Sequence, residues 1–259
     1  MEGAGAPAGE GERGGCGQGV SASRPARRPF LTAEWRDLLM VNFAVEPPLV
    51  EPHVPAGTRL DAHDGITYVS LVAFRFVDTR VRGLRAPGHH TFEELNLRFY
   101  VRREEAGELR RGVVFLKEVV PRRAIAWIAR AVYNEPYVAL PMRHAIAGVP
   151  PRVEYGWQVH GRWHSVAGRP SGPGAVPVDG SREEFITEHY WGYTRQRDGG
   201  TLEYRVEHPR WTVWPAELTE LPPLAPLYGE AFAAALTRPV SAFIADGSPV
   251  SVHLGVRVP

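Results

Sequence analysis

The chain contains one lysine, Lys117, among its 30 lysine and arginine residues. Arginine can replace lysine where only a positive charge is needed, but a guanidinium stays protonated and is a poor nucleophile. A desolvated lysine amine can instead lose its proton and attack a carbonyl carbon to form a Schiff base. Lys117 lies within the apolar segment 113–120, where desolvation would lower its pKa. The sequence therefore makes Lys117 a candidate nucleophile; the alternative is a lysine at a strand edge, paired with a carboxylate such as Glu118.

A second group of polar residues alternates with apolar residues along the segment 93–101. Successive side chains of a strand point to opposite faces, so a strand would gather these polar residues on one face. The polar set is Glu94, Asn96, Arg98 and Tyr100, and the apolar set is Leu95, Leu97, Phe99 and Val101. An acid, an amide and a guanidinium could bind a carboxylate and exchange its proton, with Arg98 as a bidentate anion clamp. The alternative is a sheet with one face in the core and the other in water.

Two aromatic segments, 188–193 and 207–211, combine titratable groups with large rings. Pockets use this combination, and so do cores and dimer interfaces, so both interpretations stay open. The close histidine pairs, His89 with His90 and His160 with His164, lie in no pattern that fixes a third ligand. We therefore expect surface or structural histidines and no metal site.

The overall composition excludes several classes of protein. The 259 residues are 44% hydrophobic and 23% charged, which is ordinary for a globular chain. A net charge of +1 gives no reason to expect a nucleic acid partner, and no apolar run is long enough for a membrane helix. The single cysteine, Cys16, cannot form an internal disulfide, which favours a reducing, cytoplasmic location. The usual nucleotide, hydrolase and zinc protease motifs are absent from the sequence.

The pattern along the chain predicts a mostly β domain that follows a tail. Residues 1–29 are rich in Gly, Ala and Pro and predict a disordered tail, so that one domain covers residues 30–259. Runs of β-branched and aromatic residues predict strands at 66–77, 96–101, 112–120, 201–208 and 249–258. Helical spacing predicts helices at 122–133 and 227–236, and Pro and Gly predict a loop at 170–180. Because the segment 66–77 is apolar at both alternating sets of positions, we expect its sheet to be covered on both faces.

An ordered set of short motifs carries a resemblance to a known family. They are WRDLL at 35–39 followed by Asn42, VPAGTRLD at 54–61, GITYVS at 65–70, ELNLRFYV at 94–101, RGVVF at 111–115 and YVALPM at 137–142. In these residues the chain resembles the uncharacterised YqjF-like family (domain of unknown function 2071), which is grouped with the acetoacetate decarboxylase-like superfamily. The resemblance implies an α+β, mostly β fold: a curled antiparallel sheet or cone-like β-barrel around a pocket, with few outer helices.

The resemblance also implies a chemistry. In acetoacetate decarboxylases a pocket lysine forms a Schiff base with a keto acid, and a strand glutamate lies nearby. Lys117 would occupy the lysine strand and Glu94 would match the glutamate, although Glu118 stands where the decarboxylases have a second lysine. The implied protein is a cofactor-independent, decarboxylase-like lyase, acting on a small keto acid by decarboxylation or by aldol or dehydration chemistry. Its catalytic residues would be Lys117 and Glu94.

The residues themselves suggest further roles. Arg98, Asn96 and Tyr100 would bind the substrate, a small carbonyl compound or keto acid, without a metal or organic cofactor. We expect no nucleic acid or membrane partner, and a homo-oligomer is compatible with the sequence. Two alternatives remain: a binding protein that uses the same pocket without catalysis, and a structural oligomeric protein. Lys117 and Glu94 facing one enclosed cavity would favour the enzyme or the binding protein.

Overall fold

The computed structural model describes residues 28–85, 88 and 90–258. The predicted tail, residues 1–29, lies outside the described residues except for its last two positions, and so does His89. The extent of the domain, from residue 30 to the end of the chain, stays a prediction.

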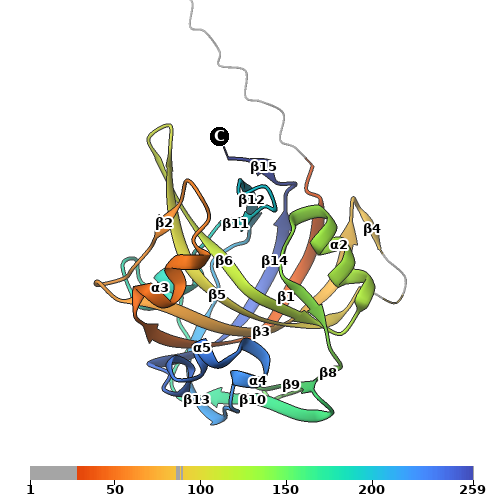
Figure 1. The fold of residues 1–259 in the computed structure, drawn as a ribbon. Helices are drawn as coiled ribbons and strands as arrows, with labels where there is room; N and C mark the ends of the chain where they lie inside the picture. Colours follow the sequence, from red (N-terminus) through yellow and green to blue (C-terminus); the bar gives the residue numbers. More distant parts are fainter. Residues whose placement is uncertain (1–27, 86–87, 89, 259) are drawn as a thin grey trace, which may run out of the picture.

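Among the described residues, fifteen strands form one curled sheet (Figure 1). Its long strands are β1 (Leu31–Val45), β3 (Thr67–Val81), β5 (Phe92–Glu105), β6 (Glu108–Val120) and β14 (Ser241–Val252). The shorter strands are β2 (Arg59–Leu60), β4 (Leu84–Arg85), β7 (Tyr137–Ala139), β8 (Met142–Ala147), β9 (Arg152–Val159), β10 (Arg162–Pro170), β11 (Trp191–Arg195), β12 (Thr201–Glu207), β13 (Val213–Glu220) and β15 (Val256–Arg257).

The order of the strands explains the curl. The central path runs β12, β11, β6, β5, β3, β1, β14 and β13, and the sheet bends so far that β12 also pairs with β14. The pairings are antiparallel except for β6 with β11 and β6 with β7. The result is a mixed, mostly β fold, which confirms the predicted fold class.

The helical segments are few and short. They are α1 (Pro47–Val50), η1 (Glu51–His53), α2 (Arg123–Tyr133), α3 (Arg182–Thr187), α4 (Ala225–Tyr228), α5 (Glu230–Ala233) and η2 (Ala235–Thr237). The predicted helix at 122–133 is confirmed as α2, which ends at Asn134 in a left-handed conformation. The predicted helix at 227–236 is wrong as one element: Gly229, with φ of 86°, separates α4 from α5, and η2 follows α5 after Ala234 as a 3-10 turn. None of the helices in the described part of the chain is long and apolar enough to cross a membrane.

Both faces of the central sheet are covered, as the apolar segment 66–77 predicts. One face packs against α4, α5 and strands β8 to β10, with Leu95, Leu97 and Phe99 in that core. The other face packs against α2 and α3, with Phe74 and Phe76 in a second core. Figure 1 shows the two groups of outer elements on different sides of the long strands. The side chains of one strand therefore belong to two different environments, and their alternation decides which one each residue enters.

Candidate functional site

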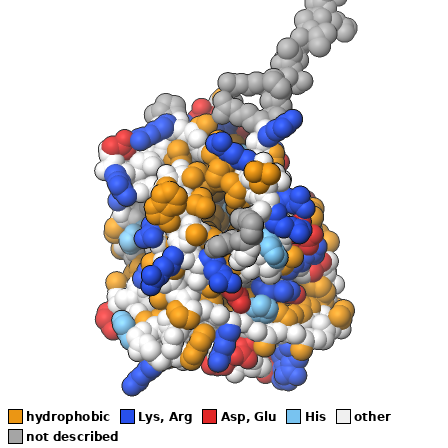
Figure 2. Space-filling model, turned by 90° about the vertical axis from the view of Figure 1, so that its right-hand side faces the viewer, with side chains coloured by type: hydrophobic (Ala, Val, Ile, Leu, Met, Phe, Trp, Pro, Cys, Tyr) orange, Lys and Arg blue, Asp and Glu red, His pale blue; other side chains and the backbone are white. Residues whose placement is uncertain are grey.

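A cavity of about 270 Å³ lies between the sheet and α2. One face of β1, β3, β5, β6 and β12 forms its wall, and α2 contributes Ile125, Ile128 and Ala129. Its apolar surface includes many aromatic rings, among them Trp35, Phe76, Phe92, Phe115, Trp191 and Trp211. Figure 2 shows a hollow framed by hydrophobic side chains on the side of the molecule that carries α2. Such a cavity suits an organic molecule with a mainly apolar body.

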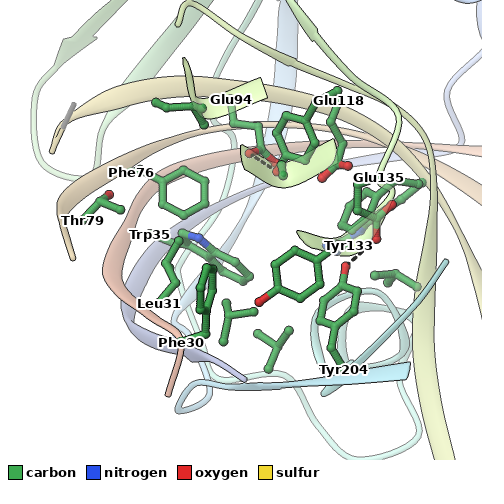
Figure 3. Close-up of a pocket in the computed structure, with 18 of the residues that line it drawn as sticks. Phe30, Leu31, Trp35, Phe76, Thr79, Glu94, Glu118, Tyr133, Glu135 and Tyr204 are labelled. Carbon is green, nitrogen blue, oxygen red and sulfur yellow. Dashed lines mark hydrogen bonds between the residues drawn. The ribbon is translucent and has the colours of Figure 1, made fainter. Parts of the chain in front are cut away.

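Three buried carboxyl groups gather at one part of this cavity (Figure 3). Glu94 lies on β5, Glu118 lies on β6 and Glu135 follows α2; their exposed fractions are 3%, 2% and 4%. Carboxyl groups are rarely this buried, because removal from water disfavours their charged form. A cluster of three in one cavity therefore needs a stabilising environment or a ligand.

The surroundings of Glu94 and Glu135 consist of hydrogen-bond donors. Glu94 accepts hydrogen bonds from Asn96 Nδ2 at 3.0 Å and from the Tyr137 hydroxyl at 2.9 Å. Glu135 accepts one from the Tyr204 hydroxyl at 2.8 Å and another from the Thr194 hydroxyl. These donors stabilise the ionised carboxylates, but burial outweighs them and raises the pKa of Glu94 and of Glu135 to about 7.

Glu118 differs from the other two glutamates. Within the described part of the chain its Oε2 atom is buried without a hydrogen-bond partner. Burial, together with the negative charges of Glu135 and Glu94, raises the pKa of Glu118 well above its usual range. The three groups thus form a cluster in which burial raises the pKa of every carboxyl group.

Arg98 and His189 also line the cavity, and both carry nitrogen atoms without a partner among the described residues. Arg98, nine-tenths buried, donates from Nη2 to the Ile186 carbonyl at 3.1 Å, and its Nε has no partner among the described residues. His189 is 7% exposed, and neither of its ring nitrogens has a hydrogen-bond partner there. Burial and the nearby Arg111 and Arg98 guanidinium groups lower the pKa of His189 well below its usual range, so its ring is neutral near pH 7.

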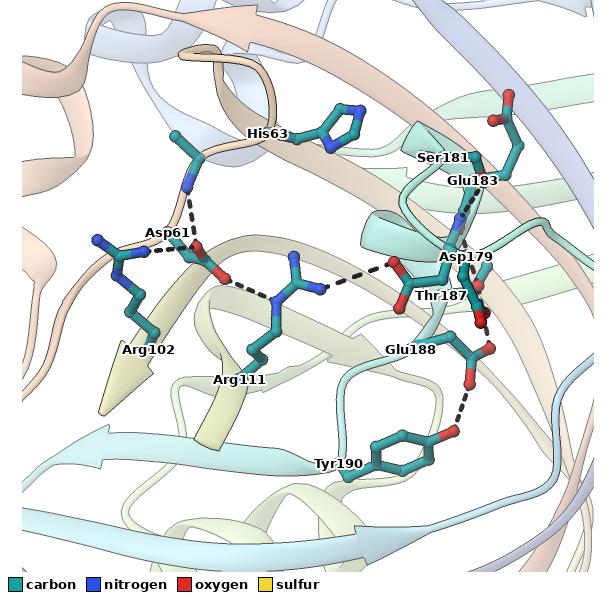
Figure 4. A network of polar contacts seen from close by, with 12 residues as sticks. Asp61, His63, Arg102, Arg111, Asp179, Ser181, Glu183, Thr187, Glu188 and Tyr190 are labelled. Carbon is teal, nitrogen blue, oxygen red and sulfur yellow. Dashed lines mark hydrogen bonds and ion pairs between the residues drawn. The ribbon is translucent and has the colours of Figure 1, made fainter. Parts of the chain in front are cut away.

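A network of polar contacts holds the segment that carries His189 (Figure 4). Arg111 on β6 donates to Asp61 at 2.9 Å and lies 3.7 Å from Glu184 of α3. Ser181 caps α3 by accepting a hydrogen bond from the Glu184 backbone N–H at 3.1 Å. Because α3 ends at Thr187 and His189 follows two residues later, these contacts hold the part of the cavity wall that Thr187 and His189 form.

The structure does not bring Lys117 and Glu94 to one cavity, and this corrects the expectation that they share one. Lys117 pairs with Leu97 and Glu118 pairs with Asn96, so Glu118 and not Lys117 enters the face that carries Glu94. Lys117 lies on the α4 side of the sheet, where its Nζ donates to the Leu227 carbonyl. The same Nζ lies 5.9 Å from the centre of the Tyr228 ring. Burial lowers the pKa of its amine, in the predicted direction.

A β-bulge in β6 is the reason why Glu118, and not Lys117, lies on the cavity face of the sheet. Val113 and Phe115 line the cavity, and strict alternation would place Lys117 beside them. However, Leu97 pairs with Lys117 and Arg98 pairs with Phe115, which leaves Leu116 as an extra residue. One inserted residue reverses which face each following side chain enters. Leu116 and Lys117 therefore face the first core, and Glu118 enters the cavity.

The other predicted site residues are distributed as follows. Glu94 and Arg98 line the cavity, and Asn96 contacts it indirectly through its hydrogen bond to Glu94. Tyr100 is fully buried, shares a 2.6 Å hydrogen bond with Ser70 and lies against the His189 ring. The polar face of 93–101 is therefore inside the protein and not in water, while the catalytic and binding roles assigned to these residues stay predictions.

Sequence reasoning missed Glu118 and Glu135 as cavity residues. The local pattern places Glu118 next to Lys117 and Glu135 just after the predicted helix at 122–133, and neither position indicates a cavity. The aromatic segments gave a useful signal, because His189, Trp191, His208 and Trp211 all line the cavity. In the described residues no group of three or more His, Cys, Asp or Glu side chains is arranged to hold a metal ion.

Comparison with known proteins defines the class of this fold. The structure resembles the enduracididine biosynthesis enzyme MppR complexed with the condensation product of pyruvate and imidazole 4-carboxaldehyde, with a TM-score of 0.62 and 14% identity, over 96% of this chain and 98% of that one. It also resembles acetoacetate decarboxylase from Legionella pneumophila, with a TM-score of 0.60 and 15% identity, over 92% and 93% of the two chains. The chain therefore shares its fold with acetoacetate decarboxylase and with MppR.

The sequence defines the family to which this chain belongs. The family model DUF2071, described as an uncharacterized conserved protein, matches residues 32–249, so the chain belongs to this family. The uncharacterized protein YqjF of Bacillus subtilis is 28% identical over 189 residues, which cover 71% of this chain and 74% of YqjF. Both findings confirm the family expected from the sequence motifs.

Proposed function

We propose that this chain binds a small organic molecule in the cavity beneath α2 and exchanges protons with it through the glutamate cluster. The observation that carries the proposal is the combination of an aromatic cavity with buried, unpartnered polar atoms on Glu118, Arg98 and His189. Buried polar groups without partners are costly, and a ligand with polar atoms would satisfy them. Structures of the related fold that hold pyruvate and a pyruvate condensation product support a ligand-binding role.

Proton exchange is the chemistry that suits the cluster. General acids and bases work best when their pKa lies near the working pH. Glu94 and Glu135, each with a pKa of about 7, meet this condition without a metal or an organic cofactor. A ligand placed among them would meet both a proton donor and a proton acceptor. The proposed reaction class is therefore a proton transfer, such as enolisation or the acid-assisted loss of a leaving group.

Filling the cavity should weaken binding strongly. Ala129 lines it from α2, whereas Ala131 is exposed on the same helix. We expect Ala129→Trp to weaken the binding of the neutral probe 2-phenylethanol at least tenfold, because the indole occupies the space of the probe. The matched variant Ala131→Trp should bind as the wild type does. Isothermal titration calorimetry on all three proteins measures this, and equal affinities for the probe would contradict the proposal.

Schiff-base chemistry at Lys117 on a keto acid is a second candidate, favoured by the lowered pKa of this half-buried amine. It would take place beside Leu227 and Tyr228, on the opposite side of the sheet from the glutamate cluster. It would use Lys117 without Glu94, because the two side chains face different cores.

The two candidates predict different results from borohydride trapping with pyruvate. The cavity proposal expects no adduct on Lys117, because its Nζ is engaged by the Leu227 carbonyl. Peptide mass spectrometry separates an adduct on Lys117 from one on the α-amino group. An adduct on Lys117 that is missing from the Lys117→Arg variant would favour Schiff-base chemistry instead.

A further inference from the structure

The polar part of the cavity holds more acids than cations. Among the described residues that line it, Glu94, Glu118 and Glu135 can become negative, and Arg98 is the one guanidinium. The lining histidines, His189 and His208, are held neutral near pH 7 because burial lowers their pKa. A cation would therefore balance this cavity better than an anion.

The hydrogen bonds around the glutamate cluster also favour a positively charged ligand. Tyrosine, threonine and asparagine donors are all directed at Glu94 and Glu135, which therefore serve as acceptors. An acceptor arrangement favours ionised carboxylates, and burial opposes their ionisation. A positive charge inside the cavity would remove this conflict, because it stabilises the carboxylates without any change in their donors.

Glu118 supplies an acceptor that nothing in the described structure uses. Its Oε2 atom is buried and unpartnered, and Figure 3 shows its carboxyl group directed toward the space between Glu94 and Glu135. A ligand with N–H donors could satisfy this atom. A ligand carboxylate would meet the negative charges of Glu94 and Glu135, which ionise with a pKa of about 7.

The aromatic rings that line the cavity also favour a cationic ligand. The faces of aromatic rings attract cations, and an ammonium ion held among rings is a stable arrangement. The rings of Trp35, Phe115 and Tyr133 lie in the same cavity as the three glutamates. Arg98, the one guanidinium among the described lining residues, donates from Nη2 to the Ile186 carbonyl and keeps its Nε without a partner.

We propose that the ligand of this cavity is an apolar organic amine, bound as an ammonium ion that donates to Glu118 and Glu135 while its body packs against the aromatic rings. This inference rests on the proposed binding function and names the chemical class of the ligand. It also separates this chain from the expected keto acid specificity, because the glutamate cluster repels carboxylates.

Three probes of similar shape test the inference: 2-phenylethylamine, 2-phenylethanol and 3-phenylpropionate, which differ mainly in charge. At about pH 7.5 the amine should bind at least tenfold more tightly than the alcohol in isothermal titration calorimetry, and the propionate should bind least. In Glu118→Gln the ratio of amine to alcohol affinity should fall at least fivefold. The matched control is Glu93→Gln, which removes the neighbouring carboxylate that contacts His144 outside the cavity, and its ratio should equal that of the wild type.

The possible contrary results are distinguishable. Equal binding of amine and alcohol by the wild type would overturn the amine assignment and leave the binding proposal standing. Tightest binding of 3-phenylpropionate would overturn it in favour of an anionic ligand. An amine preference that survives in Glu118→Gln, or that is lost equally in Glu93→Gln, would overturn the assigned position. Absence of binding by all three probes would overturn the proposed function and this inference with it.

Discussion

The free energy of unfolding should fall as the pH rises from 7 toward 9, because Glu118 keeps its proton in the folded chain while the unfolded chain has already released it. The pKa of Glu118 is well above its usual range in the folded chain, whereas in the unfolded chain it returns to about 4.5. Between those two values the folded state binds more protons than the unfolded state, so stability decreases as the pH rises. Glu94 and Glu135, with a pKa of about 7, complete their contribution near the lower end of this window.

Glu118→Gln isolates this effect. Its amide does not titrate, so we expect its stability to stay nearly constant over the same pH range and to exceed that of the wild type at pH 9. The histidines with a lowered pKa act in the opposite direction, because their unfolded forms bind more protons near pH 6.5. They titrate equally in both proteins and cancel in the difference. Urea denaturation at several pH values measures the two curves, and parallel curves would show that Glu118 does not hold a proton in the folded state.

Gly247→Ala should destabilise the protein by about 3 kcal/mol or more, because it combines a strained backbone with a steric clash. Gly247 has a φ of 78°, in the left-handed region that side chains disfavour, and it lies opposite Arg36 at a register shift in β1. A Cβ atom there would overlap the carbonyl oxygen of Trp35 and lie 2.7 Å from its carbonyl carbon. The backbone of β1 would have to move, and Trp35 would move with it.

Gly199 provides the matched control for this variant. Its φ of 85° is equally unfavourable for a side chain, but a Cβ atom at this position would meet nothing within 4 Å. Gly199→Ala should therefore cost only the conformational strain, about 1 kcal/mol. Since Trp35 lines the cavity, Gly247→Ala should also weaken 2-phenylethanol binding, whereas Gly199→Ala should not. Equal losses of stability in the two variants would show that β1 accommodates the clash.

Local sequence patterns determined much of the fold. The apolar segment 66–77 predicts a strand covered on both faces because alternation leaves no polar side for water, and β3 has this environment. Helical spacing after Pro121 predicts α2, because its apolar residues recur on one face. Alternation along 93–101 correctly separates Glu94 and Arg98 from Leu95 and Leu97, since β5 continues without interruption through these positions. Each of these patterns depends only on residues that are close together in the chain, so it can be recognised from the sequence alone.

Only the tertiary structure decided which carboxyl groups and which amine enter the cavity. The register of β6 against β5 leaves Leu116 unpaired, and that single residue exchanges the positions of Lys117 and Glu118. Glu135 reaches the same cavity from the end of α2, where Thr194 and Tyr204 donate to it from β11 and β12, far along the chain. A bulge and a contact between distant strands depend on how the whole sheet packs, so the local pattern that identifies a strand cannot fix them.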